Sequence, residues 1–465
     1  MSELRQKIQR ELACGMGEKG EAREAHKTGS ESQVAGRKTE SPTMSRNVME
    51  EVCEKENLKS ALKRVVSNKG SSGIDGMETE ELADYLKEHW PRIKEELLGG
   101  RYKPQVVKRV EIPKPGTWEK RKLGIPTVLD RFIQQAVLQV LQRDWDGTFS
   151  ENSYGFRPGR SAHQAVKKAQ EYIREGYEWV VDIDLEKFFD MVNHDRLMSR
   201  LAKSIEDKRV LKLIRSYLNA GVMENGVVKR VEEGTPQGGP LSPFLSNVVL
   251  DELDKELESR GHKFVRYADD SNIYVRSERA GKRVMDSMKR FIWKKLKLRV
   301  NENKSEVGQV SKRKFLGFSF MVYGKERTVK IRIASQSIKR FKERVRQLTN
   351  RNRSTRNQKR IRELSKYLKE WMGYYRICET PTPLRDLDSW IRHRLRSAMW
   401  RQWKTCKNRY KQLEKLGVYT KEAAQIVVSS KGSWRLSRSK AVSIALSSSY
   451  FDSLGLPRLK SLMVV

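Results

Sequence analysis

The feature that most constrains this chain is a pair of adjacent aspartates between two short runs of strand-forming residues. The pair is Asp269 and Asp270, in the segment FVRYADDSNIYV over residues 264–275. The β-branched and aromatic residues on both sides predict two strands joined by a tight turn. Aspartate is common in turns because its side chain can bond the nearby backbone, so a plain hairpin accounts for the pair taken alone. Adjacent carboxylates repel one another, however, unless water or cations lie between them.

A second predicted strand also carries two carboxylates. In VVDIDL, residues 180–185, alternation with a period of two places the apolar side chains on one face and Asp182 and Asp184 on the other. For an isolated Asp-x-Asp pattern, a strand with one hydrated face is the more common explanation.

The strand and the hairpin together are a more specific pattern than either motif alone. Phosphoryl transfer by in-line displacement uses two divalent ions about 3.5–4 Å apart. Mg²⁺ requires hard oxygen ligands, and carboxylates supply them. We therefore predict a catalytic site in which Asp184, Asp269 and Asp270 hold two Mg²⁺ ions, with Mn²⁺ able to substitute.

The charge of the chain predicts a polyanionic partner. Lys and Arg number 95 against 59 Asp and Glu, a surplus of 36 positive charges, and the pI is near 10.0. Nucleic acid is the expected partner, because basic side chains that neutralise phosphates release counterions; an anionic membrane surface is the weaker alternative. No apolar run approaches the ~18 residues of a membrane-spanning helix, so no membrane partner is expected. The four cysteines lack Cys-x-x-Cys spacing, which argues against a zinc ribbon or a disulfide framework and favours an intracellular setting.

Composition and periodicity divide the chain into four predicted parts. Residues 1–45 are polar and are expected to form a flexible leader. A helical pattern from Val48 to Val66 opens the second part, 46–100. In the third part, 101–325, short strand-type runs alternate with helical stretches, as in α+β folds. These runs are Val106 to Ile112, Trp179 to Leu185, Phe264 to Tyr267, Asn272 to Val275 and Phe315 to Phe320.

The last predicted part, 326–465, is helical and basic. Apolar residues repeat there at helical spacing among lysines and arginines, namely Ile361, Leu364, Leu368, Trp371 and Tyr375. Aromatic residues also lie among the basic ones, namely Trp371, Tyr374, Tyr375, Trp390, Trp400, Trp403, Tyr410 and Trp434. Stacking platforms in a basic groove would produce this pattern, but most of these aromatics are expected in the helix cores.

Ordered blocks across most of the chain resemble the reverse transcriptases encoded by bacterial group II introns. From about residue 47 onward the blocks are NKG (68–70) with GIDG (73–76), IPKPGTWEKRKLGIPTVLDRFIQQA (112–136), SYGFRPGRSAHQA (153–165), VVDIDLEKFFDMVNHD (180–195), GTPQGGPLSPFLSNVVLDELD (234–254), FVRYADD (264–270), NENKSE (301–306) and FLGFSF (315–320). The resemblance implies an α+β fold: a right-hand polymerase with fingers and an antiparallel palm sheet over the earlier parts. It also divides the last part into a helical thumb that doubles as the maturase domain, 326–405, and a small basic DNA-binding domain, 406–465. The same resemblance places the catalytic carboxylates at Asp184, Asp269 and Asp270.

The implied function is RNA-directed DNA polymerisation with dNTPs, an RNA template and a DNA primer. The resemblance also implies binding of group II intron RNA to assist splicing, and intron retrohoming by target-primed reverse transcription at target DNA. With no His-Asn-His module in the chain, it is closest to the endonuclease-lacking type, and the implied location is the bacterial cytoplasm at the nucleoid. Two alternatives stay open: an RNA-binding maturase without polymerase activity, and a host-adopted reverse transcriptase in repair or defence.

The resemblance assigns further residues around the aspartates. Asp182 is implied to be a structural or solvated neighbour. Phe189 is implied to lie beneath the incoming sugar, where its ring would clash with a 2′-hydroxyl, whereas Phe188 is expected in the core. In the loop GTPQGGP, residues 234–240, glycines let the backbone approach template and nucleotide, and Gln237 offers a neutral donor and acceptor beside the sugar. A flexible loop before a helix from Leu241 to Leu253 is the alternative.

Five basic residues complete the predicted site. Lys114 and Arg121 fall on the two strands of a predicted fingers hairpin, and the resemblance makes them clamps for the triphosphate; ordinary surface charge is the alternative. Lys304 is implied to lie near the leaving pyrophosphate as a general-acid candidate. Arg157 and Arg160 lie near the start of a predicted helix and are candidates for contacts to template phosphates, with helix capping as an equal contender.

Overall fold

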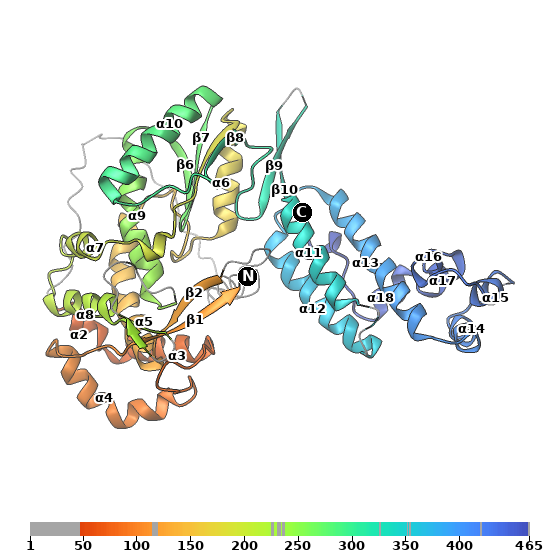
Figure 1. Ribbon diagram of the computed structural model, residues 1–465, viewed down its shortest axis with the longest axis horizontal. Coiled ribbons are helices and arrows are strands. Elements are labelled where there is room, and N and C mark those ends of the chain that lie inside the picture. Colours follow the sequence, from red (N-terminus) through yellow and green to blue (C-terminus); the bar gives the residue numbers. More distant parts are fainter. Residues whose placement is uncertain are drawn as a thin grey trace, which may run out of the picture. The chain divides into compact units, whose positions relative to one another are not determined.

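The computed structural model describes residues 47–113, 120–224, 227–229, 234, 238–324, 327–350, 352, 355–418 and 421–463. These residues form two units (Figure 1). The first contains the chain up to Tyr172 and from Tyr177 to Gly308, and the second contains Ile173–Gly176 and the chain from Gln309 onward. No helix among the described residues has the length and apolar character needed to cross a membrane.

The first unit opens with helices that pack on a long central helix. They are α2 (Val48–Val52), α3 (Lys55–Ser67) and α4 (Leu82–Leu98), and the central helix is α5 (Val128–Trp145). The sequence predicts one helix from Val48 to Val66, whereas the chain breaks this helix at Cys53–Glu54, where Glu54 has extended backbone angles. The Asn57 amide donates hydrogen bonds to the carbonyl of Val52 at 2.9 Å and to that of Ala136 at 3.1 Å. This side chain therefore fastens the break to α5.

Two four-stranded sheets follow in the first unit. One has the order β2-β1-β4-β5 and contains β1 (Val107–Pro113), β2 (Lys120–Ile125), β4 (Val222–Glu224) and β5 (Val227–Lys229). The other, the palm sheet, has the order β6-β7-β3-β8 and contains β3 (Trp179–Ile183), β6 (Lys263–Tyr267), β7 (Asp270–Val275) and β8 (Glu306–Gln309). The β1–β2 and β6–β7 pairs are antiparallel hairpins, and β3 runs antiparallel to β7. The predicted strands in this region, and the expected α+β fold, are thus confirmed.

Helices cover the palm sheet and carry most of its core. The long helix α9 (Leu241–Ser259) buries residues along its whole length, and α10 (Glu278–Phe291) lies on the sheet. Gly281 lets α10 come close, because a Cβ there would lie 2.5 Å from Cγ1 of Val307. The remaining helical segments are α6 (Ala162–Arg174), α7 (His194–Leu201), α8 (Lys208–Asn219), η1 (Asp146–Thr148), η2 (Phe188–Asp190) and η3 (Ile292–Leu296).

The second unit is a hairpin followed by helices. The hairpin strands are β9 (Phe318–Tyr323) and β10 (Thr328–Ile333), and the long helices are α11 (Ser335–Leu348), α12 (Asn357–Tyr375) and α13 (Pro381–Gln402). The short C-terminal segments are α14 (Cys406–Lys415), α15 (Lys421–Val427), α16 (Ser433–Leu436), α17 (Lys440–Ala445), α18 (Ser448–Ser453) and η4 (Lys460–Leu462). In Figure 1 the short helices α14–α17 gather beyond the far end of α13.

The β9–β10 hairpin belongs to the same unit as the helices, whereas the strand patterns predict that residues up to 325 belong with the palm. Phe318 packs against the rings of Tyr374 and Tyr375 on α12, with ring centroids 5.5 and 5.1 Å away. The Tyr374 hydroxyl donates to the carbonyl of Leu316 at 2.8 Å. These contacts explain why the boundary between the units falls at Gly308.

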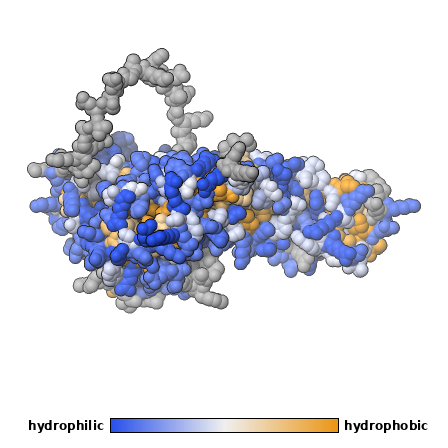
Figure 2. Space-filling model, turned by 90° about the horizontal axis from the view of Figure 1, so that it is seen from above, coloured by the Kyte–Doolittle hydropathy of each residue, from blue (hydrophilic) through white to orange (hydrophobic). Residues whose placement is uncertain are grey.

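The helical repeat in α12 is confirmed, since all five of its predicted apolar residues are buried. Of the eight aromatic residues among the basic ones, four are buried, namely Trp371, Tyr375, Trp400 and Trp403. The expectation that most of them lie in cores is therefore too high. Figure 2 shows a largely hydrophilic face with several apolar patches, one of them at the end formed by α14–α17. Val428 and Ile444 in this part of the chain are exposed.

Candidate active site

The palm sheet brings two of the predicted aspartates to the same end. Asp184 directly follows β3, and Asp270 is the first residue of β7. Because Ile183 pairs with Ser271 in antiparallel register, the next step along both strands places Asp184 beside Asp270. Asp269 lies in the turn between β6 and β7. Asp184 and Asp270, which are more than 80 positions apart in the sequence, therefore lie side by side at one end of the palm sheet.

The backbone of Asp184 is held by the segment NENKSE. Its N–H donates to Oγ of Ser305 at 2.9 Å, and its carbonyl accepts from the N–H of Asn301 at 2.8 Å. The ammonium of Lys304 lies 3.4 Å from Oδ2 of Asp184. Lys304 is 63% exposed and the Asp184 side chain 27%, so both can be reached from solvent. Lys304 therefore lies close enough to the candidate site to act on a ligand there.

The carboxylates have the chemistry of a Mg²⁺ site, but the described residues contain no group of three or more His, Cys, Asp or Glu arranged to hold a metal ion. The carboxylate oxygens of Asp184, Asp269 and Asp270 are the hard ligands that Mg²⁺ requires. The ammonium of Lys304 beside Asp184 also shows that this end of the sheet accommodates positive charge. The shared site of three carboxylates stays a prediction.

A buried arginine supports the turn that carries Asp269. All five N–H donors of Arg266 are used: Nε and Nη2 donate to the two oxygens of Asp254 at 2.7 and 2.5 Å, Nη1 to Asn247 Oδ1 at 2.9 Å and to the carbonyl of Ala268 at 3.0 Å, and Nη2 also to Ser153 Oγ at 2.8 Å. The side chains of Arg266 and Asp254 are both 0% exposed. Ala268 has a φ of +57°, a left-handed conformation that is uncommon for a residue with a Cβ. The bond to its carbonyl helps to hold that conformation.

The block SYGFRPGR also lies under this turn. A Cβ on Gly155 would overlap the backbone nitrogen of Ala268 and lie 3.0 Å from its Cα. The carbonyl of Gly155 accepts from the Asn247 amide at 2.8 Å, and the N–H of Tyr154 donates to the carbonyl of Arg266 at 2.9 Å. This block therefore packs against the β6–β7 hairpin and supports its turn.

The environment of Arg157 contradicts its predicted contact with template phosphate. Its side chain is 2% exposed, and its guanidinium donates to Asp146 Oδ1 at 2.9 Å and to the carbonyls of Ser150 and Ser153 at 2.5 and 3.0 Å. A group buried and bonded in this way has a structural role. Capping does not explain it either, because Ser161 and Gln164 form the reciprocal bonds of a capping box at the start of α6.

Arg160 is closer to solvent and stays a candidate for template binding. It forms an ion pair with Glu151, which raises the pKa of the guanidinium, and it lies over the ring of Tyr154. Its side chain is 24% exposed.

The glycines of the loop at 234–240 contact protein atoms. A Cβ on Gly234 would lie 2.8 Å from the carbonyl oxygen of Phe189, and one on Gly238 would overlap the carbonyl of Gly124 on β2. Both glycines have positive φ. These contacts, and not only an approach to template or nucleotide, explain the need for glycine. Gln237 and Lys114 lie outside the described residues.

The remaining predicted residues lie on ordered elements. Phe188 is buried in the core as predicted, and Phe189 is partly buried and packs edge-on against it with ring centroids 5.2 Å apart. Arg121 is on β2, opposite Ile112 on β1. Asp182 pairs with Asn272 across the β3–β7 ladder. The helix predicted from Leu241 to Leu253 is confirmed as the first part of α9.

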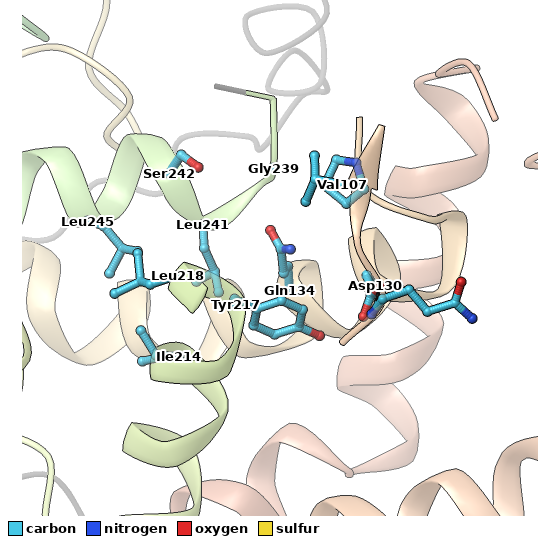
Figure 3. A pocket seen from close by; sticks show the side chains of 12 residues that line it. Val107, Asp130, Gln134, Ile214, Tyr217, Leu218, Gly239, Leu241, Ser242 and Leu245 are labelled. Carbon is cyan, nitrogen blue, oxygen red and sulfur yellow. Dashed lines mark hydrogen bonds between the residues drawn. The ribbon is translucent and has the colours of Figure 1, made fainter. Parts of the chain in front are cut away.

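A small cavity next to the glycine loop is too small for a nucleotide. Its volume is about 20 Å³, and it lies among α5, α8 and the start of α9. Figure 3 shows the Tyr217 hydroxyl directed toward Asp130, and Gln134 lies beneath Gly239. Asp130 accepts from the Tyr102 hydroxyl at 2.9 Å, and burial raises the pKa of its carboxyl. The cavity has room for about one water, and its lining combines apolar side chains with the hydrogen-bonded carboxyl of Asp130.

Arg266, Asp254 and Asn247 are not among the residues that the sequence patterns predict for the site. One signal was available for Arg266, since a charged residue in the apolar run FVRY has to be paired once that strand is buried. No local pattern indicates its partners, which come from a different element, α9.

Two family models match this chain. Residues 112–320 match the reverse transcriptase (RNA-dependent DNA polymerase) family, and residues 338–417 match the group II intron, maturase-specific domain. A solved structure of a partial Cas6-RT-Cas1--Cas2 complex aligns with 53% of this chain and 42% of its own chain, at 26% identity and a TM-score of 0.35.

Several curated proteins are similar to parts of this chain. Protein YkfC of Escherichia coli K12 is 31% identical over 304 residues, which cover 57% of this chain and 78% of YkfC. The group II intron-encoded protein LtrA of Lactococcus lactis subsp. cremoris is 37% identical over 206 residues, 44% of this chain but 34% of LtrA. Nuclear intron maturase 2 of Arabidopsis thaliana is 29% identical over 177 residues, 30% of this chain and 24% of that protein. With a polymerase domain followed by a maturase-specific domain, this chain belongs to the family of group II intron-encoded reverse transcriptases and maturases.

Proposed function

We propose that this chain copies an RNA template into DNA from a DNA primer, using dNTPs and two Mg²⁺ ions held by Asp184, Asp269 and Asp270. The observation that carries the proposal is the register of the palm sheet, because it puts the end of β3 beside the turn of the β6–β7 hairpin. When bound, the ions would activate the attacking 3′-hydroxyl and stabilise the leaving oxygen. The chain itself supplies the oxygen ligands and orients the substrates.

The incoming nucleotide would contact Arg121, Phe189 and Lys304. Arg121 would supply a planar guanidinium that bonds two triphosphate oxygens, and Lys304 would supply a positive charge on a flexible side chain. The ion pair of Lys304 with Asp184 supports this place for Lys304. In the same proposal Lys114 and Gln237 complete the nucleotide site, and Arg160 contacts the template strand.

The second unit would bind group II intron RNA and assist splicing, and the chain would act in retrohoming by target-primed reverse transcription at target DNA. The match of residues 338–417 to a maturase-specific domain supports the RNA partner, and the surplus of 36 positive charges supports polyanion binding in general. A target in chromosomal DNA would place the protein at the nucleoid.

The direct test is extension of a DNA primer on an RNA template with dNTPs and Mg²⁺. Asp269→Ala and Asp184→Ala should each lower the rate by at least about 10³-fold, since each removes a charge at the reacting centre. The matched control is Asp195→Ala, because Asp195 is an 82% exposed carboxylate on α7 whose loss should leave the rate unchanged. Equal inactivity of wild type and Asp269→Ala, with RNA binding intact, would instead favour a maturase without polymerase activity.

The metal ligands can be tested without measuring polymerisation. Fe²⁺ bound in place of Mg²⁺ reduces added hydrogen peroxide to a hydroxide ion and a hydroxyl radical, becoming Fe³⁺, and the radical cuts the nearby backbone. We expect cuts near residues 184 and 269 that excess Mg²⁺ suppresses and that Asp269→Ala abolishes. Cuts confined to other parts of the chain would rule out these aspartates as the site.

Phe189 offers a test of sugar selection. Phe189→Ala should lower the preference for dNTPs over rNTPs by roughly 10-fold or more, because the clash with the 2′-hydroxyl is lost. Competition between labelled dNTP and rNTP during extension measures this ratio. An unchanged ratio would remove Phe189 from the nucleotide site.

A further inference from the structure

A cleft in the second unit has a lining that suits a nucleotide. It has a volume of about 490 Å³, within the range of about 300–1,000 Å³ that small-molecule sites occupy. The lining residues are Arg346, Thr349, Asn350, Arg394, Ser397 and Trp434. They come from α11, α13, α16 and the turn after α11, and they include two guanidinium groups, one indole and no carboxylate.

Trp434 is exposed but held in place. The ring of His393 packs on it with a centroid distance of 3.6 Å, and Nε2 of His393 donates to the carbonyl of Trp434 at 2.9 Å. Burial and neighbouring arginines lower the pKa of His393, so the ring is neutral near pH 7. The Trp434 side chain remains 39% exposed and lines the cleft. It is thus an indole platform whose orientation is fixed before a ligand arrives.

The two arginines bring positive charge to the same cleft. Nε of Arg394 donates to Oγ1 of Thr349 at 2.7 Å, and this hydroxyl donates to the carbonyl of Val345 at 2.5 Å. These two hydrogen bonds fix the guanidinium of Arg394 against the C-terminal end of α11. Arg346 is exposed and its guanidinium lies 5.8 Å from the ring centroid of Trp390.

Further positive charge gathers on the same side. Arg394 lies 5.4 Å and Lys342 5.9 Å from the Trp390 ring centroid, so three cations surround one indole. Cations this close repel one another, and the free energy of that repulsion falls when an anion binds between them.

We propose that this cleft binds one unpaired nucleotide of a structured RNA, with its base stacked on Trp434 and its phosphate near Arg346 and Arg394. Stacking on aromatic rings with phosphate contacts to basic side chains is how proteins bind unpaired RNA bases. RNA is favoured because five of the six lining residues lie within 338–417, the maturase-specific match. The inference rests on the proposed RNA-binding function and names the contact that this function would use.

The cleft also joins two parts that the sequence analysis separates. Arg346, Thr349 and Arg394 belong to the predicted thumb and maturase part, 326–405, whereas Trp434 comes from the predicted DNA-binding part, 406–465. The indole that a base would stack on is therefore supplied by the C-terminal part, which gains a role in RNA binding.

Binding of the full chain to a labelled RNA hairpin with an unpaired loop, and to a blunt RNA duplex, tests the proposal. Trp434→Ala should weaken hairpin binding by roughly 5- to 150-fold, the loss expected for one stacked base, and Trp434→Phe should restore most of it. Trp293→Ala is the matched control, since Trp293 is a 51% exposed indole in the first unit. Arg346→Ala changes an exposed residue and should lower the slope of log affinity against log salt by about 1.

A 5-iodouridine in the loop should crosslink to Trp434 under ultraviolet light, and Arg346→Ala tests the site even if Trp434→Ala misfolds. Hairpin affinity and salt slope equal to wild type in both variants would overturn the proposal, as would crosslinks only elsewhere. Tighter binding of a DNA loop of the same sequence, with the same loss in Trp434→Ala, would overturn the assignment to RNA. Wild-type primer extension is measured separately, so a failed polymerase and a failed RNA site give different results.

Discussion

Arg266→Met tests whether the buried arginine holds the turn of the candidate active site. The substitution keeps a long apolar side chain but leaves Asp254 buried without a counter-ion. It also removes the donor to the carbonyl of Ala268, the residue immediately before Asp269. We expect both lower stability and slower polymerisation.

The structure sets the size of each effect. Removing one partner of a fully buried ion pair costs about 3–5 kcal/mol, because the remaining charge cannot be solvated. For a unit of this size, each kcal/mol lowers Tm by roughly 2–4 °C, so Tm should fall by roughly 6–20 °C. A displacement of the turn by about 1 Å would lower kcat on the order of 10²-fold. Arg266→Lys keeps the positive charge but not the five donors of the guanidinium. Its Tm and kcat should therefore lie between those of the wild type and of Arg266→Met.

Calorimetry and single-turnover primer extension, at a temperature where the variant is folded, measure the two effects. Arg101→Met is the control, because Arg101 pairs with Glu95 at 2.8 Å with both side chains largely exposed, and such pairs contribute less than ~1 kcal/mol. If Arg266→Met unfolds at the wild-type Tm and extends primers at the wild-type rate, the buried network neither stabilises the unit nor positions the turn.

Three further results are expected. Gly155→Ala would press a Cβ into the turn backbone and should cost about 1–3 kcal/mol of stability along with most of the extension activity, whereas Gly147→Ala, which meets nothing within 4 Å, should change neither. Lys304→Met removes an exposed ion pair, so the free energy of unfolding should change by less than ~1 kcal/mol while single-turnover extension slows on the order of 10²-fold; an unchanged rate would exclude it as a proton donor. Burial raises the pKa of Cys53 to about 11, so its thiol stays protonated near pH 8 and iodoacetamide should label the exposed Cys406 before Cys53; peptide mass spectrometry would contradict this if Cys53 and Cys406 reacted equally, and Cys53 labelling should rise as the pH approaches about 11.

The sequence predicts the palm well because its signals are local. The strand patterns at 179–185 and 264–275 depend on alternation and on turn residues, and both appear as antiparallel strands of one sheet. The adjacency of Asp184 and Asp270 is different, since it depends on register between distant strands. The joint occurrence of the two acidic motifs predicts it, and the family resemblance assigns the same residues, but neither gives the register.

Helix ends and unit boundaries are harder to predict because tertiary contacts decide them. The break at Cys53–Glu54 has no proline or glycine to mark it, and its distinguishing contact is the Asn57 amide bound to α5. The hairpin after Gly308 follows the palm in sequence but packs its Phe318 against α12. Neither contact can be predicted from a short stretch of sequence, because each joins residues that are far apart along the chain.

Motifs near an active site also do not distinguish a residue that binds substrate from one that supports the fold. Arg157 and Arg160 are three positions apart in one block, yet the first is buried with its guanidinium bonded to protein, and the second is partly exposed above a tyrosine ring. A guanidinium whose donors are already bonded inside the protein cannot bind a phosphate without losing those bonds. Exposure and hydrogen bonding therefore separate the two roles, and by the same criterion Arg266 belongs with Arg157 as support for the site, whereas the exposed Arg346 of the cleft remains able to bind a nucleic acid.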